Sequence, residues 1–148
     1  MRIRQLSVFL ENTAGRLSAV CDALASEGLS LSSLCLADTE KFGILRLLLS
    51  DWERAKEVLE RRGYVVAVTD VVATVVADEA GSLARMLGEV ERAGIGVEYM
   101  YGFTVKASES AVMVLRFDRT DEAISRLLEA RVHVMSSVEL FERATLFA

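Results

Sequence analysis

The hydrophobic positions of this chain change their spacing several times, from the alternation of a strand to the three-to-four spacing of a helix. Residues 3–10 are rich in β-branched and aromatic side chains and predict a strand. The next apolar residues follow helical spacing, and this helix is expected to begin after Gly15 and to stop at Gly28. Its apolar face comprises Leu17, Val20, Cys21 and Leu24.

The rest of the first half predicts two more strands, a helix and a fourth strand. Residues 29–37 alternate, whereas residues 42–49 are almost continuously apolar, which is typical of a strand covered on both faces. A second helix is expected to start at Asp51 and to end at Gly63, and residues 64–68 predict a strand. The order is therefore strand, helix, strand, strand, helix, strand.

The second half repeats this order with related residues at the same places. The segment Asn12-Thr13-Ala14-Gly15-Arg16-Leu17 recurs as Asp78-Glu79-Ala80-Gly81-Ser82-Leu83, so that Gly81 takes the place of Gly15. The chain is therefore interpreted as two units, 1–69 and 70–148, each just large enough to hold a core. Strands are expected at 71–76, 95–103, 111–117 and 132–138, with a helix after the first and a helix before the last.

Each unit has the βαββαβ order of a ferredoxin-like fold, so the fold class is α+β. Right-handed crossovers place both helices on one face of a four-stranded antiparallel sheet. The helix-free faces are expected to meet another sheet, in this chain or in a second copy. The joint at Thr69-Asp70 is too short for a flexible linker, so we expect rigid packing of the units. The apolar residues of the tail, 139–148, predict that it docks.

Composition narrows the classes of function. The hydrophobic fraction is 52% and the mean hydropathy is +0.32, yet every stretch long enough to span a bilayer contains charges, so no membrane span or signal peptide is expected. The net charge of −5 argues against nucleic-acid binding. These features predict a cytoplasmic protein.

Catalytic and metal-binding residues are scarce. His133 is the single histidine, and Cys21 and Cys35 are the two cysteines, so neither a metal site nor a Cys/His or Ser/His/Asp arrangement can be assembled. Both cysteines fall on apolar positions and are expected to be buried thiols. There is no P-loop and no GxGxxG. We therefore expect no enzymatic activity, no catalytic residue, no bound metal and no cofactor.

The repeated N/D-x-x-G-x-L turn between the first strand and the first helix of a βαββαβ unit resembles that of the ACT domain. The resemblance covers both halves of the chain, and the most similar type is the small stand-alone tandem ACT protein. It implies regulation by a bound amino acid, held at the interface between two units and lined by a glycine turn and by a strand of the partner unit. The family usually has proline before the glycine, where this chain has Ala14 and Ala80.

The physical chemistry of the turn suits a carboxylate ligand. Glycine allows close approach, and the helix that follows presents unpaired N–H groups at its positive end. Loop 1 (residues 12–17) is predicted to be the better carboxylate receptor because Asp78 and Glu79 already place negative charge at loop 2 (residues 78–83). Asp78 can instead accept a ligand ammonium. The alternative is that Asn12 or Thr13 merely caps the helix and that Gly15 is only a turn residue.

The strand at 95–103 is the other candidate surface. Tyr99, Tyr101 and Phe103 share one face by alternation, whereas Glu98 and Met100 share the other. Small residues stand at the matching positions of the first unit, and Gly96 and Gly102 leave space beside the strand, so an aromatic wall beside a pocket is predicted. The alternative is that the aromatic rings fill the core or a sheet interface. The candidate ligand-binding residues are Asn12, Thr13, Ala14, Gly15, Arg16, Leu17, Ser33, Cys35, Asp78, Ala80, Gly81, Leu83, Glu98, Tyr99, Met100 and Tyr101.

Three functions remain open from the sequence. The first is an amino-acid-binding sensor, the second is a structural module that has lost its ligand, and the third is a regulatory subunit whose sheet face pairs with a partner enzyme. The excess of apolar residues and the two-fold character of the fold favour a homodimer.

Overall fold

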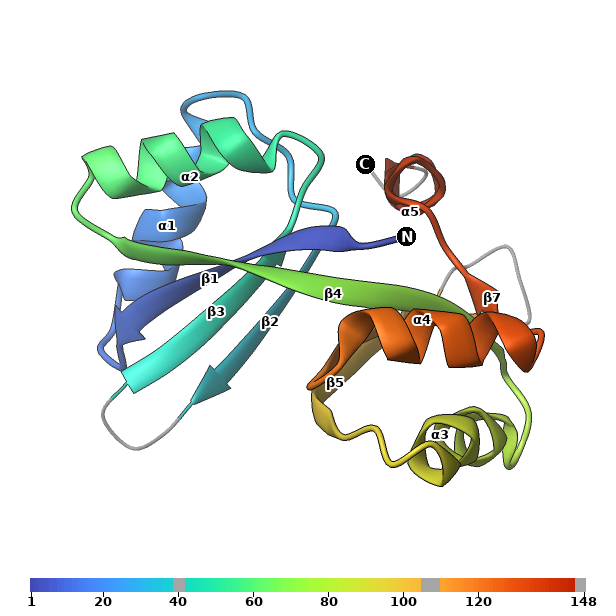
Figure 1. The fold of residues 1–148 in the computed structure, drawn as a ribbon. Helices are drawn as coiled ribbons and strands as arrows, with labels where there is room; N and C mark the ends of the chain where they lie inside the picture. Colours follow the sequence, from blue (N-terminus) through green and yellow to red (C-terminus); the bar gives the residue numbers. More distant parts are fainter. Residues whose placement is uncertain (39–41, 105–109, 146–148) are drawn as a thin grey trace. The chain divides into compact units, whose positions relative to one another are not determined.

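The computed structural model describes residues 1–38, 42–104 and 110–145 (Figure 1). The chain divides into two compact units, Arg4–Thr69, here the first unit, and Met1–Ile3 with Asp70–Ala148, the second unit. The elements are β1 (Ile3–Glu11), α1 (Arg16–Ala25), β2 (Ser33–Asp38), β3 (Phe42–Leu48), α2 (Trp52–Arg61), β4 (Val65–Ala77), α3 (Ser82–Arg92), β5 (Val97–Thr104), β6 (Ser110–Phe117), α4 (Thr120–Glu129), β7 (His133–Val134) and α5 (Ser137–Thr145).

The first unit is a ferredoxin-like sheet with the strand order β2-β3-β1-β4. β3 pairs antiparallel with both neighbours, and the pairs Leu6↔Leu47 and Leu36↔Leu45 give the register. Figure 1 shows α1 and α2 together on one side of this sheet. The predicted βαββαβ order and the single helix-bearing face are therefore confirmed.

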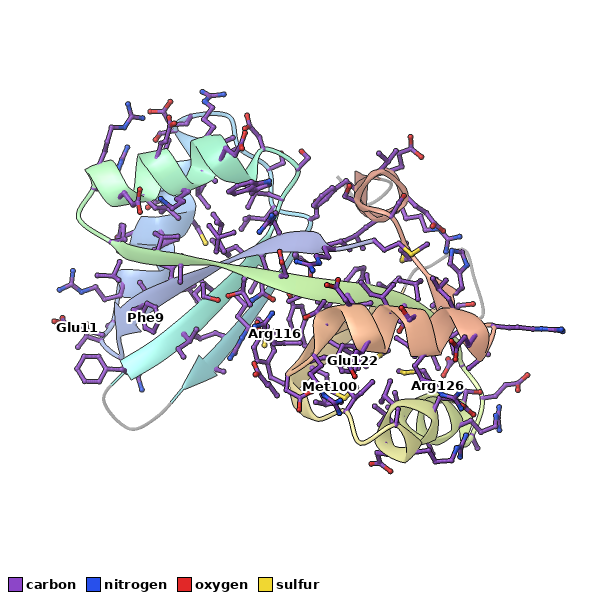
Figure 2. All side chains as sticks on the ribbon, viewed as in Figure 1. Phe9, Glu11, Met100, Arg116, Glu122 and Arg126 are labelled. Atoms are coloured by element: carbon purple, nitrogen blue, oxygen red, sulfur yellow. The ribbon has the colours of Figure 1, made fainter. Side chains whose placement is uncertain are left out.

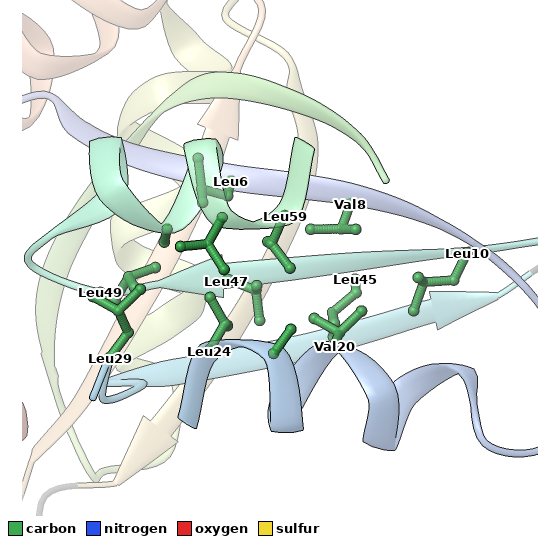
Figure 3. Packing of buried hydrophobic residues seen from close by; sticks show 13 residues of the cluster. Leu6, Val8, Leu10, Val20, Leu24, Leu29, Leu45, Leu47, Leu49 and Leu59 are labelled. Atoms are coloured by element: carbon green, nitrogen blue, oxygen red, sulfur yellow. The ribbon is translucent and has the colours of Figure 1, made fainter. Parts of the chain in front are cut away.

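The core of the first unit lies between this sheet and its two helices (Figure 3). Alternate residues of β1 and β3, such as Leu6, Val8 and Leu47, point into it because successive side chains of a strand face opposite sides. They meet Val20 and Leu24 of α1, which follow helical spacing. Leu6, Val8, Val20 and Leu47 are all fully buried, so the two predicted periodicities converge on one layer.

The second unit repeats the arrangement with the strand order β7-β4-β6-β5. β6 pairs antiparallel with β4 through Val72↔Leu115, and β7 pairs with β4 through Thr74↔Val134. The register between β5 and β6 shifts between Val97 and Tyr99. The core of this unit is built mainly from Val72, Val76, Met86, Val90, Ile95, Leu115, Phe117, Ala123, Leu127 and Val134.

One strand replaces the two that were predicted on either side of Thr69-Asp70. β4 runs without a break from Val65 to Ala77, and its residues are divided between the two units after Thr69. The segment contains neither glycine nor proline and is mostly valine, threonine and alanine, so nothing local ends the strand. Thr69 and Asp70, which the sequence predicted to be a short connection between the two units, are therefore interior residues of one strand.

The C-terminal region differs from the prediction of a strand over 132–138. β7 has only two residues, and α5 begins at Ser137. Ser136 caps the start of α5, because its Oγ accepts a hydrogen bond of 3.1 Å from the backbone N–H of Glu139. The spacing of Ser136 and Glu139 is that of a capping box, a sequence signal for a helix start that the strand assignment overlooked.

The tail docks through α5, as expected. Leu140 is only 1% exposed. Figure 1 shows α5 and α4 on opposite sides of β4. Leu146 and Phe147, which were also expected to dock, lie outside the described residues.

The N-terminal residues belong to the second unit. The Arg2 guanidinium donates to Asp121 and also to Asp70 Oδ2, at 3.0 Å for the latter. The hydrogen bonds to Asp121 and then Asp70 raise the pKa of Arg2 above its already high ordinary value. Arg2 therefore stays charged and holds the start of β1 to this unit.

Two further sequence expectations concern burial. Cys21 and Cys35 are free thiols, but both are half-buried and not fully buried as predicted. Cys35 lies opposite Arg46 on β3, and thus on the sheet face that α1 and α2 do not cover.

Among the helices of the described residues, none combines the length and apolar character needed to cross a bilayer.

Candidate functional site

Loop 1 and loop 2 have the same backbone conformation. The N–H of Thr13 donates to Glu11 O, and the N–H of Glu79 donates to Ala77 O, both at 2.8 Å. The N–H four residues after each glycine donates back to that glycine's carbonyl, from Ala19 to Gly15 and from Arg85 to Gly81. The sequence duplication is therefore also a duplication of loop geometry.

Both loops depend on their glycine. Gly15 and Gly81 each have φ +86°, a backbone conformation that residues with a Cβ rarely adopt. Each glycine is the N-cap residue of its helix, and a glycine has no side chain with which to cap it. One alternative from the sequence was that Asn12 or Thr13 caps the first helix. In the structure Gly15 holds that cap position instead.

The charges around the two loops differ from the pattern that the sequence suggested. Arg16 of loop 1 forms an ion pair with Glu11, with 2.8 Å between Nη2 and Oε2. At loop 2, Arg85 Nη2 donates to Ser82 Oγ at 2.8 Å, and its Nη1 lies 3.3 Å from where a Cβ on Gly81 would stand. Arg85 thus brings a positive charge to loop 2, a residue that sequence reasoning missed because the first unit has Ala19 at the equivalent position.

A cavity of about 480 Å³ opens beside loop 2 in the second unit. It lies at the end of β4, beside the start of α3 and the turn that leads into β7. Its volume is in the range of about 300–1,000 Å³ typical of small-molecule sites. The lining residues are Val75, Val76, Ala77, Ser82, Arg85, Met86, Glu89, Ala130, Arg131, Val132 and His133.

The first unit has a smaller cavity, of about 270 Å³, at the equivalent place. It is formed by the end of β1, by Arg16 at the start of α1, and by residues 62–65 before β4. Figure 2 shows two of its lining residues, Phe9 and Glu11, at the end of β1. The fold therefore produces the same hollow twice, and the side chains decide its size and charge.

Two of the lining groups in the second unit are held by partners. Glu89 accepts from Arg126 at 2.8 Å and also pairs with Arg92; Figure 2 labels Arg126 on α4. His133 lies 2.9 Å from Glu139 Oε1. The sequence analysis treated His133 as an ordinary strand residue and did not single out Glu89. Neither residue belongs to a sequence motif that would mark it as part of a binding site.

The candidate strand residues lie away from the loop of their own unit. Cys35 is opposite Arg46, which is opposite Ser7, five residues before loop 1 begins at Asn12. Ser33 lies further still along β2. In the second unit, Tyr101 is opposite Val114, which is opposite Ala73, again five residues before Asp78. Within one unit, therefore, loop and strand residues do not form a single site.

The space that the sequence predicted beside Gly96 and Gly102, next to the aromatic strand β5, is occupied by side chains of the protein itself. A Cβ on Gly102 would stand 2.6 Å from Met113 Sδ, and one on Gly96 would stand 3.1 Å from Asp118 Oδ2. Met100 packs against the core of the second unit (Figure 2). Tyr99 and Tyr101 occupy the opposite face from Met100 and are half-buried.

No cluster of three or more histidine, cysteine, aspartate or glutamate side chains suited to a metal ion occurs among the described residues. The chemistry that the hollows offer is hydrogen bonding, charge and apolar contact. Such groups can bind a small molecule.

Comparison with known proteins identifies the family. Residues 1–144 match the sequence pattern of a protein family that is described as an ACT domain pair. The chain belongs to the ACT domain pair family. ACT domains are regulatory domains and not catalytic ones. No curated protein matches the chain.

Solved structures agree with this assignment. The protein BT0572 from Bacteroides thetaiotaomicron is 38% identical, covers 95% of this ACT domain pair and 96% of its own chain, and superposes with a TM-score of 0.89. The regulatory subunit of aspartate kinase from Thermus thermophilus, in a ligand-free form, is 18% identical over 86% of this chain and 91% of its own, with a TM-score of 0.63. That from Thermus flavus is 20% identical over 84% and 87%, with a TM-score of 0.62. The two regulatory subunits share the fold of the ACT domain pair.

Proposed function

We propose that this ACT domain pair is a regulatory protein that binds an amino acid at the interface between ACT units. The observation that carries the proposal is the pair of equivalent glycine turns, each with φ +86° and each placing a glycine at the N-cap of a helix. Family membership supports a regulatory role, and the duplicated loops supply two places where a ligand can bind.

The ligand's carboxylate would be received by N–H groups at the start of α1, where the helix dipole is positive. The proposed loop residues are Asn12 to Leu17, with Asp78 in loop 2 as an acceptor for a ligand ammonium. Tyr99 and Tyr101 of β5, or Ser33 and Cys35 of β2, would line the site from the partner unit. The aromatic pair favours a ligand with a flat side chain.

Regulation would follow from a shift in population. A ligand that bridges two ACT units favours one relative orientation of them, by no more than its differential affinity for the two states. We propose a cytoplasmic homodimer that passes this change to a separate enzyme. The regulatory subunits of aspartate kinase show that proteins with this fold serve as subunits of an enzyme.

A second candidate function is a partner-binding subunit that holds no ligand. The first unit supports it by presenting large apolar side chains to solvent, and Phe9, Phe42 and Val65 are 47%, 60% and 67% exposed. Such residues suit a protein interface. Binding of a partner enzyme without any response to amino acids would favour this function.

The test is a thermal-shift screen of the purified protein against the twenty amino acids and common aromatic acids. A ligand at about 100 times its Kd stabilises a folded protein by about 2.7 kcal/mol, which raises Tm by several degrees. Gly15→Asp should abolish the shift because it brings a negative charge and a Cβ to the receptor loop. Gly81→Asp should have a smaller effect, since loop 2 is already acidic.

Gly28→Asp is the matched control. Gly28 also has a positive φ, of 69°, and no atom lies within 4 Å of where its Cβ would stand, but it lies at the other end of α1. Its variant should lose stability and keep the ligand response. A flat response to every amino acid by the well-folded protein would contradict the proposal. Loss of binding in Gly81→Asp with full binding in Gly15→Asp would reverse the assignment of the loops.

A further inference from the structure

The cavity of the second unit holds positive charge that its surroundings do not neutralise. Arg85 donates to the neutral Ser82 hydroxyl, and no carboxylate of the described residues pairs with Arg85 or Arg131. Other arginines of this unit do have such partners: Arg116 pairs with Glu98, Arg119 with Glu122, Arg126 with Glu89, and Arg143 with Glu139. In a chain with a net charge of −5, two arginines without a carboxylate partner among the residues that line one cavity are unexpected.

The neighbouring acidic groups do not cancel this charge. Glu89 lines the same cavity but is shared between Arg126 and Arg92. Glu139, the partner of His133, also pairs with Arg143 at 3.2 Å. The local balance therefore favours a negatively charged guest.

The backbone at Arg131 adds a second, independent observation. Arg131 has φ +60°, the one positive φ outside glycine among the described residues. Backbone conformations of this kind cost free energy for a residue with a Cβ and are concentrated at functional sites. The first unit has Gly63 in the equivalent turn, with φ +85°. A position that is best filled by glycine therefore holds an arginine in the second unit, and this residue is one of those that line the cavity.

The equivalent cavity of the first unit serves as an internal comparison. Its two arginines are engaged, Arg16 with Glu11 at 2.8 Å and Arg62 with Ser26 Oγ at 3.0 Å. Its volume is about 270 Å³, against about 480 Å³ in the second unit. In the first unit the hollow is small and one of its arginines pairs with a carboxylate. In the second unit it is larger and neither of its arginines has a carboxylate partner within the described part of the chain.

We propose that the cavity of the second unit is a binding site for a small oxyanion, held by the guanidinium groups of Arg85 and Arg131. Guanidinium groups bind carboxylate and phosphate through paired charge-assisted hydrogen bonds. Val76 and Met86 form an apolar wall, at 8% and 4% exposure, beside these cations. The ligand is a molecule with a carboxylate or phosphate group next to a short apolar segment.

This site lies within the second unit, whereas the proposed amino-acid site lies between units and uses loop 1 as its carboxylate receptor. It stands on the cavity, the unpaired cations and the backbone of Arg131, so it does not depend on amino-acid binding. Gly15→Asp, which tests the proposed function, should leave this site unchanged. Failure of one proposal is therefore distinguishable from failure of the other.

The test is an NMR titration of the 15N-labelled full chain at constant ionic strength. The probes are butyrate and propyl phosphate, with the neutral amide butyramide as the matched uncharged compound. Saturable shifts of the backbone amides of residues 82–86 and 131–133 are expected with one or both anions, and not with butyramide. The anion that binds more tightly identifies carboxylate or phosphate as the group recognised.

Three variants make the test specific. Arg131→Gly keeps the turn favourable and removes the cation, so the Kd of the preferred anion should rise about ten-fold, as should that of Arg85→Gln. Arg61→Gln removes an exposed charge of α2 in the first unit, outside both cavities, and should change the Kd less than two-fold. No saturable shift at these amides, equal binding of butyramide, or unaltered affinity in Arg131→Gly would overturn the proposal.

Discussion

Arg131 in the second unit occupies the same backbone position as Gly63 in the first. Each follows the last turn of a helix, and each donates its N–H to the carbonyl three residues earlier, to Leu128 and to Glu60, both at 2.9 Å. Each has a positive φ. This is the helix ending at which glycine is preferred, so the two copies of one turn differ in backbone strain and in charge.

The first prediction concerns that strain. Arg131→Gly removes a left-handed penalty of about 1–2 kcal/mol. Glycine costs about 0.5–1 kcal/mol through the entropy of the unfolded chain. The free energy of unfolding, measured in urea, should stay the same or rise by up to about 1.5 kcal/mol. A fall of more than about 1 kcal/mol would show that the Arg131 side chain stabilises the fold, against the role in binding proposed for it.

The second prediction compares alanine substitutions at two glycines of α3, Gly81 at its N-cap and Gly88 in its interior. Gly81→Ala should lower the free energy of unfolding by about 1 kcal/mol because φ +86° is strained for alanine. The Arg85 side chain beside the new Cβ can move, so crowding adds little. Gly88→Ala, inside α3, should raise the free energy of unfolding by about 1 kcal/mol through helix propensity. Equal effects of both changes in chemical denaturation would contradict this assignment of Gly81.

The third prediction tests the core of the first unit. Leu47 is fully buried and pairs with Leu6, so Leu47→Ala should cost about 2–5 kcal/mol by leaving a cavity. Leu36 is on the same sheet face but is 44% exposed at the edge strand β2, so Leu36→Ala should cost about 1 kcal/mol or less. Urea denaturation of both variants measures the difference. Similar losses would mean that Leu36 is covered by another molecule in solution, as a homodimer interface on that edge would require.

The fourth prediction concerns close packing in the second unit. An alanine at position 102 would place its Cβ 2.6 Å from Met113 Sδ, so Gly102→Ala should destabilise by about 1–3 kcal/mol. The loss should be smaller when it is introduced into a Met113→Ala background, and the double-mutant cycle measures the coupling. Additive effects would show that the carbonyl of Val112, 3.3 Å away, is the obstacle instead.

The local features of this protein are determined by its sequence. The helix starts at Gly15 and Gly81, the βαββαβ order and the duplication all follow from short-range spacing, and short-range rules govern turns and helix ends. The sequence misled where two local signals competed. The run from Val65 to Ala77 has no breaker, so the two expected strands are one. At residues 132–138, the capping spacing of Ser136 and Glu139 outweighs the β-branched residues of the expected strand.

The cavity of the second unit, in contrast, is a product of tertiary structure. Ser82 and Arg85 come from the start of one helix and Arg131 from the turn after another, and only the folded sheet brings these distant parts of the chain to one hollow. No spacing rule links them. Whether an arginine is neutralised also depends on which carboxylates the fold places beside it, as Glu11 does for Arg16. The sequence determined where the chain turns, and the tertiary structure decided which charges meet.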